Sequence, residues 1–408
     1  MHVELHPSFA DTAAGIEASE LTSACVHCGF CLATCPTYLD TRDERDSPRG
    51  RIYLIKQLLE TGAASGQTHT HLDRCLTCRS CETTCPSGMQ YGELLDIGRG
   101  LMEQQVPRSA TQRGCRWLLR GLLSRPSWFA AILRLGQAVR PLLPVSLRRQ
   151  IPPRQARKPV PLRQHARTML LLDGCVQPAA TPNTNRSARR VFDRLGITLQ
   201  PAQRAGCCGA VNYHLAAHED GLDDMRRNID AWWPDIESGA EAIVSSATGC
   251  GSMLVDYGRL LAADPVYAAK AQRVSELTRD LGEILLQEDL SQLAIDPGSA
   301  KIAVQTPCSL QHGLQLPELI TGVLGRAGFT LTATRDSHLC CGSAGTFSIL
   351  QPAMSGRLRD RKIAALTENS PDLIATGNVG CQLHLQAASN VPVLHWIELL
   401  DQDRQLPA

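Results

Sequence analysis

CVHCGFCLATCP, residues 25–36, is the stretch that decides the fold of this 408-residue chain. The same spacing returns in CLTCRSCETTCP, residues 75–86, so the pattern CxxCxxCxxxCP occurs twice. Three cysteines at steps of three can surround one [4Fe-4S] cluster from a single loop, and the fourth, stopped by proline, reaches the cluster of the other motif. The predicted ligands are Cys25, Cys28, Cys31 and Cys85 for a first [4Fe-4S] cluster and Cys75, Cys78, Cys81 and Cys35 for a second.

The residue types around these cysteines favour iron-sulfur clusters over zinc. Soft thiolate ligands suit such clusters, whereas a structural zinc site needs only four ligands and usually presents two CxxC pairs. We interpret His27, inside the first motif, as a neighbour that influences solvation and not as a ligand. Between the motifs, SPRGRIYLIKQLLETG has apolar residues at helical spacing and a glycine stop at Gly62, which predicts a connecting helix. Residues 1–105 are therefore predicted to form an α-helical two-cluster ferredoxin domain.

Composition restricts the class of protein. The chain has 17 cysteines, 43% hydrophobic and 20% charged residues, and a net charge of +1, which is typical of a folded protein without a general attraction to nucleic acid. The N-terminus lacks the pattern of a secretory signal, and no uncharged apolar run is long enough to span a bilayer. We therefore expect a cytoplasmic protein, whose reduced cysteines bind metal or take part in chemistry.

A second cysteine pattern repeats in the rest of the chain, where RAGCCGAVNY at 204–213 is echoed by HLCCGSAGTF at 338–347. Each copy opens with an apolar run that ends in cysteine, TMLLLDGC or KIAVQTPC, and two further apolar runs follow in each. These runs predict buried strands, so residues 168–300 and 301–408 are predicted to form two α/β units with their cysteines at strand ends. The cysteines are Cys175, Cys207, Cys208 and Cys250 in the first CCG unit, and Cys308, Cys340, Cys341 and Cys381 in the second.

The adjacent cysteines allow three interpretations: a buried pair of structural thiols, a vicinal disulfide, or ligands of an iron-sulfur site. Free cysteine packs like a small hydrophobic residue, and a vicinal disulfide would be strained and reducible in the cytoplasm. The repetition of the pair with matching upstream and downstream cysteines favours cluster ligation. Cys115 lies outside both patterns and is predicted to be an unligated thiol.

The paired CCG units resemble the cysteine-rich domains of the heterodisulfide reductase type, which follow a two-cluster ferredoxin domain in several respiratory iron-sulfur subunits. With SPRGRIYLIKQ, CLTCRSCETTCPSGMQYGELLDIGR, SATGC and GNVGC, they make the chain most similar to the iron-sulfur subunits of the bacterial glycolate oxidase (glycolate dehydrogenase) family. The resemblance implies an α+β multidomain fold. It also implies an electron-transfer subunit of an oxidoreductase that works beside FAD-carrying subunits, which oxidise glycolate, and D-lactate as a further substrate, for a respiratory acceptor other than oxygen or NAD.

Other functions of the same architecture stay open. The chain could serve a flavin dehydrogenase for glycerol 3-phosphate or D-lactate, or it could be a catalytic subunit like that of heterodisulfide reductase. The fullest form of the CCG unit has five cysteines, but Ala247 and Met253 in the first unit and Asn378 and His384 in the second stand where the additional cysteines would lie. An unusual non-cubane cluster, an ordinary four-thiolate cluster and no metal are all compatible with four cysteines. Our hypothesis is that at least one unit binds an additional iron-sulfur cluster.

The linker, residues 106–167, is strongly basic, because no acidic residue occurs between Glu103 and Asp173. GCRWLLRGLLSRPSWFAAILRLGQAVRPLL alternates apolar residues with arginine at helical spacing, which predicts an amphipathic segment broken at Pro126 and Pro141. Such a segment can pack between domains, meet an acidic partner subunit, or lie on anionic lipid. The last interpretation predicts a peripheral protein on the cytoplasmic face of the inner membrane, near a quinone acceptor.

No motif for catalysis is visible in the sequence. We find no GxGxxG opening a βα unit, no P-loop, no HExxH and no arrangement of serine, histidine and aspartate. Four histidines lie near the CCG cysteines, and we interpret them as packed or surface residues: His214, His312, His338 and His384. We therefore expect no catalytic residue and no substrate site on this chain, so that hydride removal takes place on a flavin-binding partner.

Overall fold

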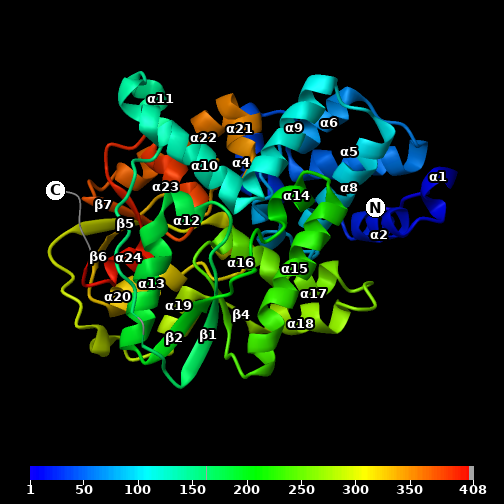
Figure 1. Cartoon of the computed structure of the whole chain (residues 1–408). Helices are drawn as coiled ribbons and strands as arrows, with labels where there is room; N and C mark the ends of the chain where they lie inside the picture. The colour runs from blue at the N-terminus through cyan, green and yellow to red at the C-terminus, as the bar shows by residue number, and fades with distance from the viewer. Residues whose placement is uncertain (162, 404–408) are drawn as a thin grey trace.

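The computed structural model describes residues 1–161 and 163–403. The N-terminal region is helical, and the remainder contains two four-stranded sheets. In Figure 1 the N-terminal helices lie at the upper right, the linker helices run along the top, and the sheets lie below and to the left. This arrangement confirms the predicted α+β multidomain fold.

The N-terminal region forms one helical core around the two cysteine motifs. Its main helix, α5 (Pro48–Thr61), begins at a side-chain cap from Ser47 and ends at Gly62, whose φ of 66° is the left-handed conformation that glycine adopts readily. This is the connecting helix that the sequence predicted, and its apolar face is buried against α8 (Tyr91–Gln105). The other elements are α1 (Pro7–Ala10), α2 (Ala13–Ser23), α3 (Cys31–Thr34), α4 (Pro36–Thr41), η1 (Glu44–Asp46), α6 (Gly66–Asp73) and α7 (Ser80–Thr83).

Each CCG unit is built on a parallel sheet. The first sheet has the order β2-β1-β3-β4 and the second the order β6-β5-β7-β8, and every pair of neighbouring strands is parallel. The strands are β1 (Arg167–Leu172), β2 (Ile197–Pro201), β3 (Ile243–Ser245), β4 (Thr278–Asp280), β5 (Lys301–Gln305), β6 (Thr330–Thr332), β7 (Leu373–Thr376) and β8 (Val393–His395). The three strands predicted for each unit are present. The fourth strand was not predicted, because β4 and β8 are three residues long, β4 contains only polar residues, and β8 ends in histidine.

Helices connect the parallel strands and cover the sheets, as parallel pairing requires. Those of the first unit are α12 (Gln177–Ala180), α13 (Pro182–Arg194), α14 (Ala210–His214), α15 (His218–Glu237), α16 (Thr248–Val255), α17 (Tyr257–Leu260), α18 (Ala268–Leu277), α19 (Leu281–Leu285) and η3 (Leu290–Leu293). Those of the second are η4 (Ser309–Gly313), α20 (Leu319–Arg326), α21 (Phe347–Leu350), α22 (Pro352–Thr367), α23 (Val379–Gln386) and α24 (Trp396–Leu399).

The two units share one hydrophobic core. Leu171 and Val244 of the first sheet belong to the same buried cluster as Val304 and Trp396 of the second unit. The cysteine-bearing ends of the units also touch, because the Thr248 amide donates to the carbonyl oxygen of Gly377 at 3.2 Å. The repeat is therefore packed as a single body, with the carboxyl ends of the two sheets turned toward each other.

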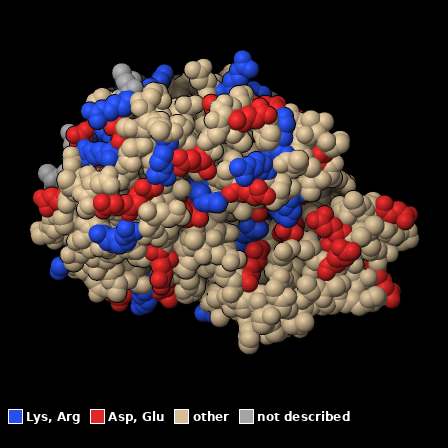
Figure 2. All heavy atoms as spheres, turned by 90° about the horizontal axis from the view of Figure 1, so that it is seen from below, with Lys and Arg blue, Asp and Glu red and all other residues tan. Residues whose placement is uncertain are grey.

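The linker forms α9 (Ala110–Leu123), α10 (Pro126–Val139), η2 (Arg140–Leu142) and α11 (Val145–Gln150), and none of the residues in these helices is buried. Pro126 begins α10 and Pro141 lies in η2, at the two predicted interruptions. Helix α10 lies beside α12, and α11 lies beside α23, so the linker passes over both units. The face seen from below in Figure 2 carries acidic and basic side chains interspersed, which matches the small net charge. Within the described residues, no helix is long and apolar enough to cross a membrane.

Candidate iron-sulfur sites

The four cysteines predicted for the first cluster line one cavity: Cys25, Cys28, Cys31 and Cys85. His27 and Gly29 adopt positive φ angles of 58° and 84°, which turn the first motif around this cavity. The second motif repeats this conformation, with φ angles of 53° at Thr77 and 59° at Arg79. The structure thus brings Cys85 of the second motif to the three cysteines of the first motif, and Cys81, predicted for the other cluster, borders the same cavity.

The second predicted set also gathers in one place. Burial is the largest cause that raises the pKa of the Cys81 thiol well above its ordinary value, and the neighbouring thiols of Cys78, Cys75 and Cys35 add to it. Two groups donate to the Cys75 sulfur, the Thr77 amide at 3.4 Å and the Tyr91 hydroxyl at 3.7 Å. Hydrogen bonds of this kind to a ligand sulfur are one means by which a protein tunes an iron-sulfur cluster.

The surroundings of these cysteines fit an anionic cluster. Arg51 is fully buried, and Cys75 and Cys35 are among the groups that act electrostatically on its guanidinium. Arg99 is also buried, and its Nη2 donates to the carbonyl oxygen of Cys75 at 3.0 Å. Four thiolates give an iron-sulfur cluster a negative charge, which buried arginines compensate. The donor set therefore suits thiolate-ligated iron.

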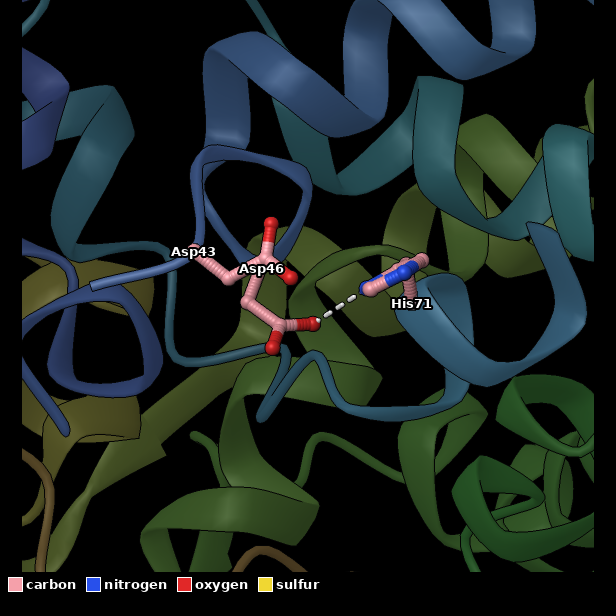
Figure 3. A group of neighbouring side chains, drawn as sticks. All are labelled: Asp43, Asp46 and His71. Atoms are coloured by element: carbon pink, nitrogen blue, oxygen red, sulfur yellow. Dashed lines mark hydrogen bonds and ion pairs between the residues drawn. The ribbon is translucent and has the colours of Figure 1, made fainter. Parts of the chain in front are cut away.

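A network of buried charged side chains lies next to Cys35 of the second predicted set of cysteines. Asp46 accepts from His71 Nδ1 at 2.7 Å, as Figure 3 shows, and from Arg74 Nη1 at 3.0 Å. Asp43 lies near this pair but is bound by Arg45. Because arginines already balance both carboxylates, we interpret this group as structural and not as a metal site. Its backbone lies against the cluster region, since Cys35 Sγ lies 3.7 Å from the carbonyl oxygen of Asp46.

The CCG cysteines gather as the repeat predicts. In the second unit, Cys308 Sγ lies 3.7 Å from Cys340 Sγ, and Cys341 Sγ lies 3.3 Å from Cys381 Sγ. The first unit has the same chain of neighbouring thiols, made of Cys175, Cys207, Cys208 and Cys250. Cys115 is exposed on α9 and belongs to neither group. Each unit therefore presents four converging thiols, the donor type of an iron-sulfur site.

Among the described residues, the second unit is the one whose cysteines pack against the second ferredoxin motif. Cys78 packs in one apolar cluster with Cys308 and Cys340, and the charges of these groups act on one another. His312 joins the two regions as well, since its Nδ1 lies 3.0 Å from Thr83 Oγ1. No signal in the sequence indicated this contact, because the residues are far apart along the chain.

The first unit meets the ferredoxin region through several ion pairs, and the second unit also forms one, between Arg357 and Asp40 at 2.6 Å. Arg79 lies 3.3 Å from Asp256, Arg259 lies 2.8 Å from Glu93, and His214 lies 3.0 Å from Asp96. The two CCG units are thus alike in their cysteines but differ in their relation to the predicted clusters.

His395 joins the two units and makes their stability depend on pH. Its Nε2 donates to the carbonyl oxygen of Ser246 at 2.7 Å, and its Nδ1 accepts from the Ile397 amide. Burial, partly opposed by backbone contacts with Ser246 and Gly377, lowers the pKa of His395 to about 4. Between this value and the ordinary histidine pKa of about 6.5, the unfolded chain binds a proton that the folded chain does not, so stability falls as the pH falls.

We expect acidification from about pH 7 to about pH 5 to remove about 2 kcal/mol of unfolding free energy through this group. His395→Gln removes the titrating ring and keeps a hydrogen-bond donor, so the loss on acidification should be smaller in this variant. Denaturant unfolding of both proteins at the two pH values measures the difference. An equal loss in the two proteins would contradict the assignment.

The fold and the gathered thiols define an iron-sulfur protein that joins a dicluster domain to paired cysteine-rich domains. Residues 21–89 match the family described as 4Fe-4S dicluster domain, and residues 169–255 and 302–386 each match the family described as cysteine-rich domain. The chain is 51% identical to the glycolate oxidase iron-sulfur subunit of Escherichia coli, over 98% of this chain and 99% of that protein. The chain belongs to this family of iron-sulfur subunits.

More distant relatives share parts of this likeness. A probable glycolate oxidase iron-sulfur subunit of Bacillus subtilis is 29% identical over 89% of this chain and 88% of its own length. Lactate utilization protein A of Bacillus velezensis is 27% identical over 56% of this chain and 96% of its own length. A crystal structure of a hypothetical protein from Helicobacter pylori superposes with a TM-score of 0.56 at 10% identity, covering 96% of this chain and 72% of that one, which shows the fold alone.

Proposed function

We propose that the chain is the iron-sulfur subunit of a glycolate oxidase, also called glycolate dehydrogenase, and transfers electrons from a flavin-binding partner toward a respiratory acceptor. The observation that carries the proposal is the likeness over nearly the full length to the Escherichia coli subunit. The contact of Cys78 with Cys308 supports transfer from the ferredoxin region into the second CCG unit.

The chemistry divides between this chain and its partner. Oxidation of glycolate to glyoxylate releases two electrons and two protons, and we assign their first acceptance to FAD on the partner subunits. Iron-sulfur clusters bound at the predicted cysteines would then take up and release electrons one at a time. The residues of this chain hold these sites, exclude water by burial, and adjust their charge through Arg51 and Arg99. We assign no catalytic residue to this chain.

Purification with its partner subunits tests the function. The complex should contain FAD and should reduce an artificial dye when glycolate is added. Lactate is the second candidate substrate, because lactate utilization proteins are among the relatives. Dye reduction with glycerol 3-phosphate but not with glycolate would assign the chain to a different dehydrogenase.

We further propose that at least one CCG unit binds iron. Anaerobically purified protein should then contain more than the about eight iron atoms of two [4Fe-4S] clusters. Iron and acid-labile sulfide assays on the same sample measure this content. A firm total of about eight would contradict iron in the CCG units, because the predicted N-terminal sites account for all of it.

For the linker we propose contact with anionic lipid at the cytoplasmic face of the inner membrane, where a quinone can accept electrons. Trp117, Trp128 and Leu142 are exposed by 71%, 61% and 87%. Arg116 and Arg120 pair with Asp73 and Asp220, so α9 is anchored to the body of the protein while its apolar side chains remain exposed. Tryptophan and arginine together suit a lipid headgroup region.

We expect the protein to float with liposomes that contain anionic lipid, and to be released by salt, because each basic residue near such a surface contributes about 1 kcal/mol. The double change Trp117→Ser and Trp128→Ser should reduce flotation. Tyr53→Ser is a matched control, since Tyr53 is an exposed aromatic residue outside the linker. Absence of flotation at low salt would favour docking to a partner subunit instead.

A further inference from the structure

Lys362 is a buried lysine that forms no ion pair with the described carboxylates. It lies on α22 with 3% of its surface exposed, and its Nζ donates to the carbonyl oxygens of Asp336 at 2.9 Å and Ser337 at 3.1 Å. Among the described residues, no carboxylate lies within ion-pair distance of this ammonium. Lys362 lines the same cavity as Cys340 of the second CCG unit.

A buried ammonium of this kind needs a compensating negative charge, because desolvation of an unpaired ion is costly. Bare thiols do not supply this charge. A protonated thiol is neutral. Thiolates that ligate iron are deprotonated and anionic. A metal-loaded second unit would therefore provide the counter-charge that Lys362 lacks in the protein alone.

The first unit has a neutral residue at the equivalent place. Helices α15 and α22 pack on their CCG loops in the same way, because a Cβ on Gly209 would meet the Gly221 carbonyl oxygen and one on Gly342 that of Ser355. Asn228 in α15 and Lys362 in α22 follow this contact by the same number of residues, so they occupy equivalent positions in the two units.

Asn228 is fully buried, and its Nδ2 donates to the Cys207 carbonyl oxygen at 2.7 Å, so it holds the loop before the cysteine pair without a charge. Arg227 also reaches the Cys207 carbonyl, but it is paired with Asp224. At this equivalent helix position the two units therefore differ by one positive charge, that of Lys362.

We propose that Lys362 is the counter-ion of an iron-sulfur centre in the second CCG unit and raises the reduction potential of that centre. The inference rests on the proposed function, in which at least one CCG unit holds iron. Reduction adds one negative charge to a centre, and a fixed neighbouring cation stabilises that charge. The unit that contacts Cys78 is thus also the unit prepared to accept an electron from the ferredoxin region.

The test compares Lys362→Met, Lys362→Arg and the wild type in the anaerobically purified complex. Lys301→Met is the matched control, because Lys301 is an exposed lysine of the same unit. Iron per chain is measured first, and reduction potentials are then determined by titration followed with electron paramagnetic resonance. We expect one potential to shift to lower values in Lys362→Met, with Lys362→Arg and Lys301→Met close to the wild type.

The outcomes separate this inference from the function on which it rests. Unchanged potentials in Lys362→Met at full iron content would overturn the role of Lys362. Loss of iron in both Lys362→Met and Lys362→Arg would also overturn it, because packing and not charge would then be responsible. Loss of iron in Lys362→Met that is restored in Lys362→Arg would support it. A wild-type content of only about eight iron atoms would instead contradict iron in the CCG units, before any variant is compared.

Discussion

Cys85→Ser is expected to remove one [4Fe-4S] cluster, so that iron per chain falls by about four atoms and glycolate-dependent dye reduction is lost. The reason is geometric: Cys85 comes from the second motif but lines the cavity of Cys25, Cys28 and Cys31. A serine hydroxyl is a poor replacement for a soft thiolate ligand. Iron assay, the visible absorption of the clusters and dye-coupled turnover of the complex measure the effect.

Two further cysteine variants make this result specific. Cys35→Ser should remove the other cluster, because Cys35 lies with Cys75, Cys78 and Cys81. Cys115→Ser should change neither iron content nor turnover, because this thiol is exposed on α9. Full iron content in Cys85→Ser would disprove the crossed ligand assignment. Loss of iron with unchanged turnover would show that the dye takes electrons directly from flavin.

The second large effect is expected on stability. Asp46 is fully buried and balances His71, Arg74 and Arg51, the last at 3.8 Å. Asp46→Asn keeps the shape of the side chain but leaves the buried cations without their carboxylate. Breaking a buried ion pair by removal of one partner costs about 3–5 kcal/mol, so we expect a loss of this order in unfolding free energy. Denaturant unfolding followed by circular dichroism and by cluster absorption measures it.

Asp43→Asn is the natural control for this change, because Asp43 belongs to the same group of side chains but pairs with the exposed Arg45. Exposed ion pairs contribute little to stability, so its loss should be much smaller. Similar losses for the two variants would mean that burial of Asp46 does not determine the strength of this network. The comparison also tests whether the second cluster is retained only when the Asp46 backbone, which lies against Cys35, stays in place.

The helical N-terminal region could be predicted from the cysteine spacing, and the strands of the two CCG units from their apolar runs. Both signals are local in the sequence. The linking helix over Pro48–Thr61 could be read from its apolar residues and from Gly62. The strand β8 could not be predicted, since three residues provide no periodicity and its pairing with β7 depends on the assembled sheet. Lys362 was also missed, because a lysine on an amphipathic helix is normally expected at the surface and only the packing of α22 shows its burial.

The sequence also could not predict that the two CCG units contact the ferredoxin region differently. Equal cysteine patterns suggested equal units, but only one unit meets Cys78. The difference arises from tertiary contacts such as His312 with Thr83, which join residues far apart along the chain. Ion pairs at the other contact, such as Arg259 with Glu93, carry no signature in the sequence either.

The shared core of the CCG units has a consequence for biosynthesis. Ribosomes deliver the first sheet well before Trp396, yet Leu171 and Val244 are buried together with that tryptophan. While the last residues are still inside the ribosome, the apolar face of the first sheet is therefore exposed to water, where chaperones can bind it. We therefore expect a premature stop before Trp396 to destabilise the first CCG unit as well as the second.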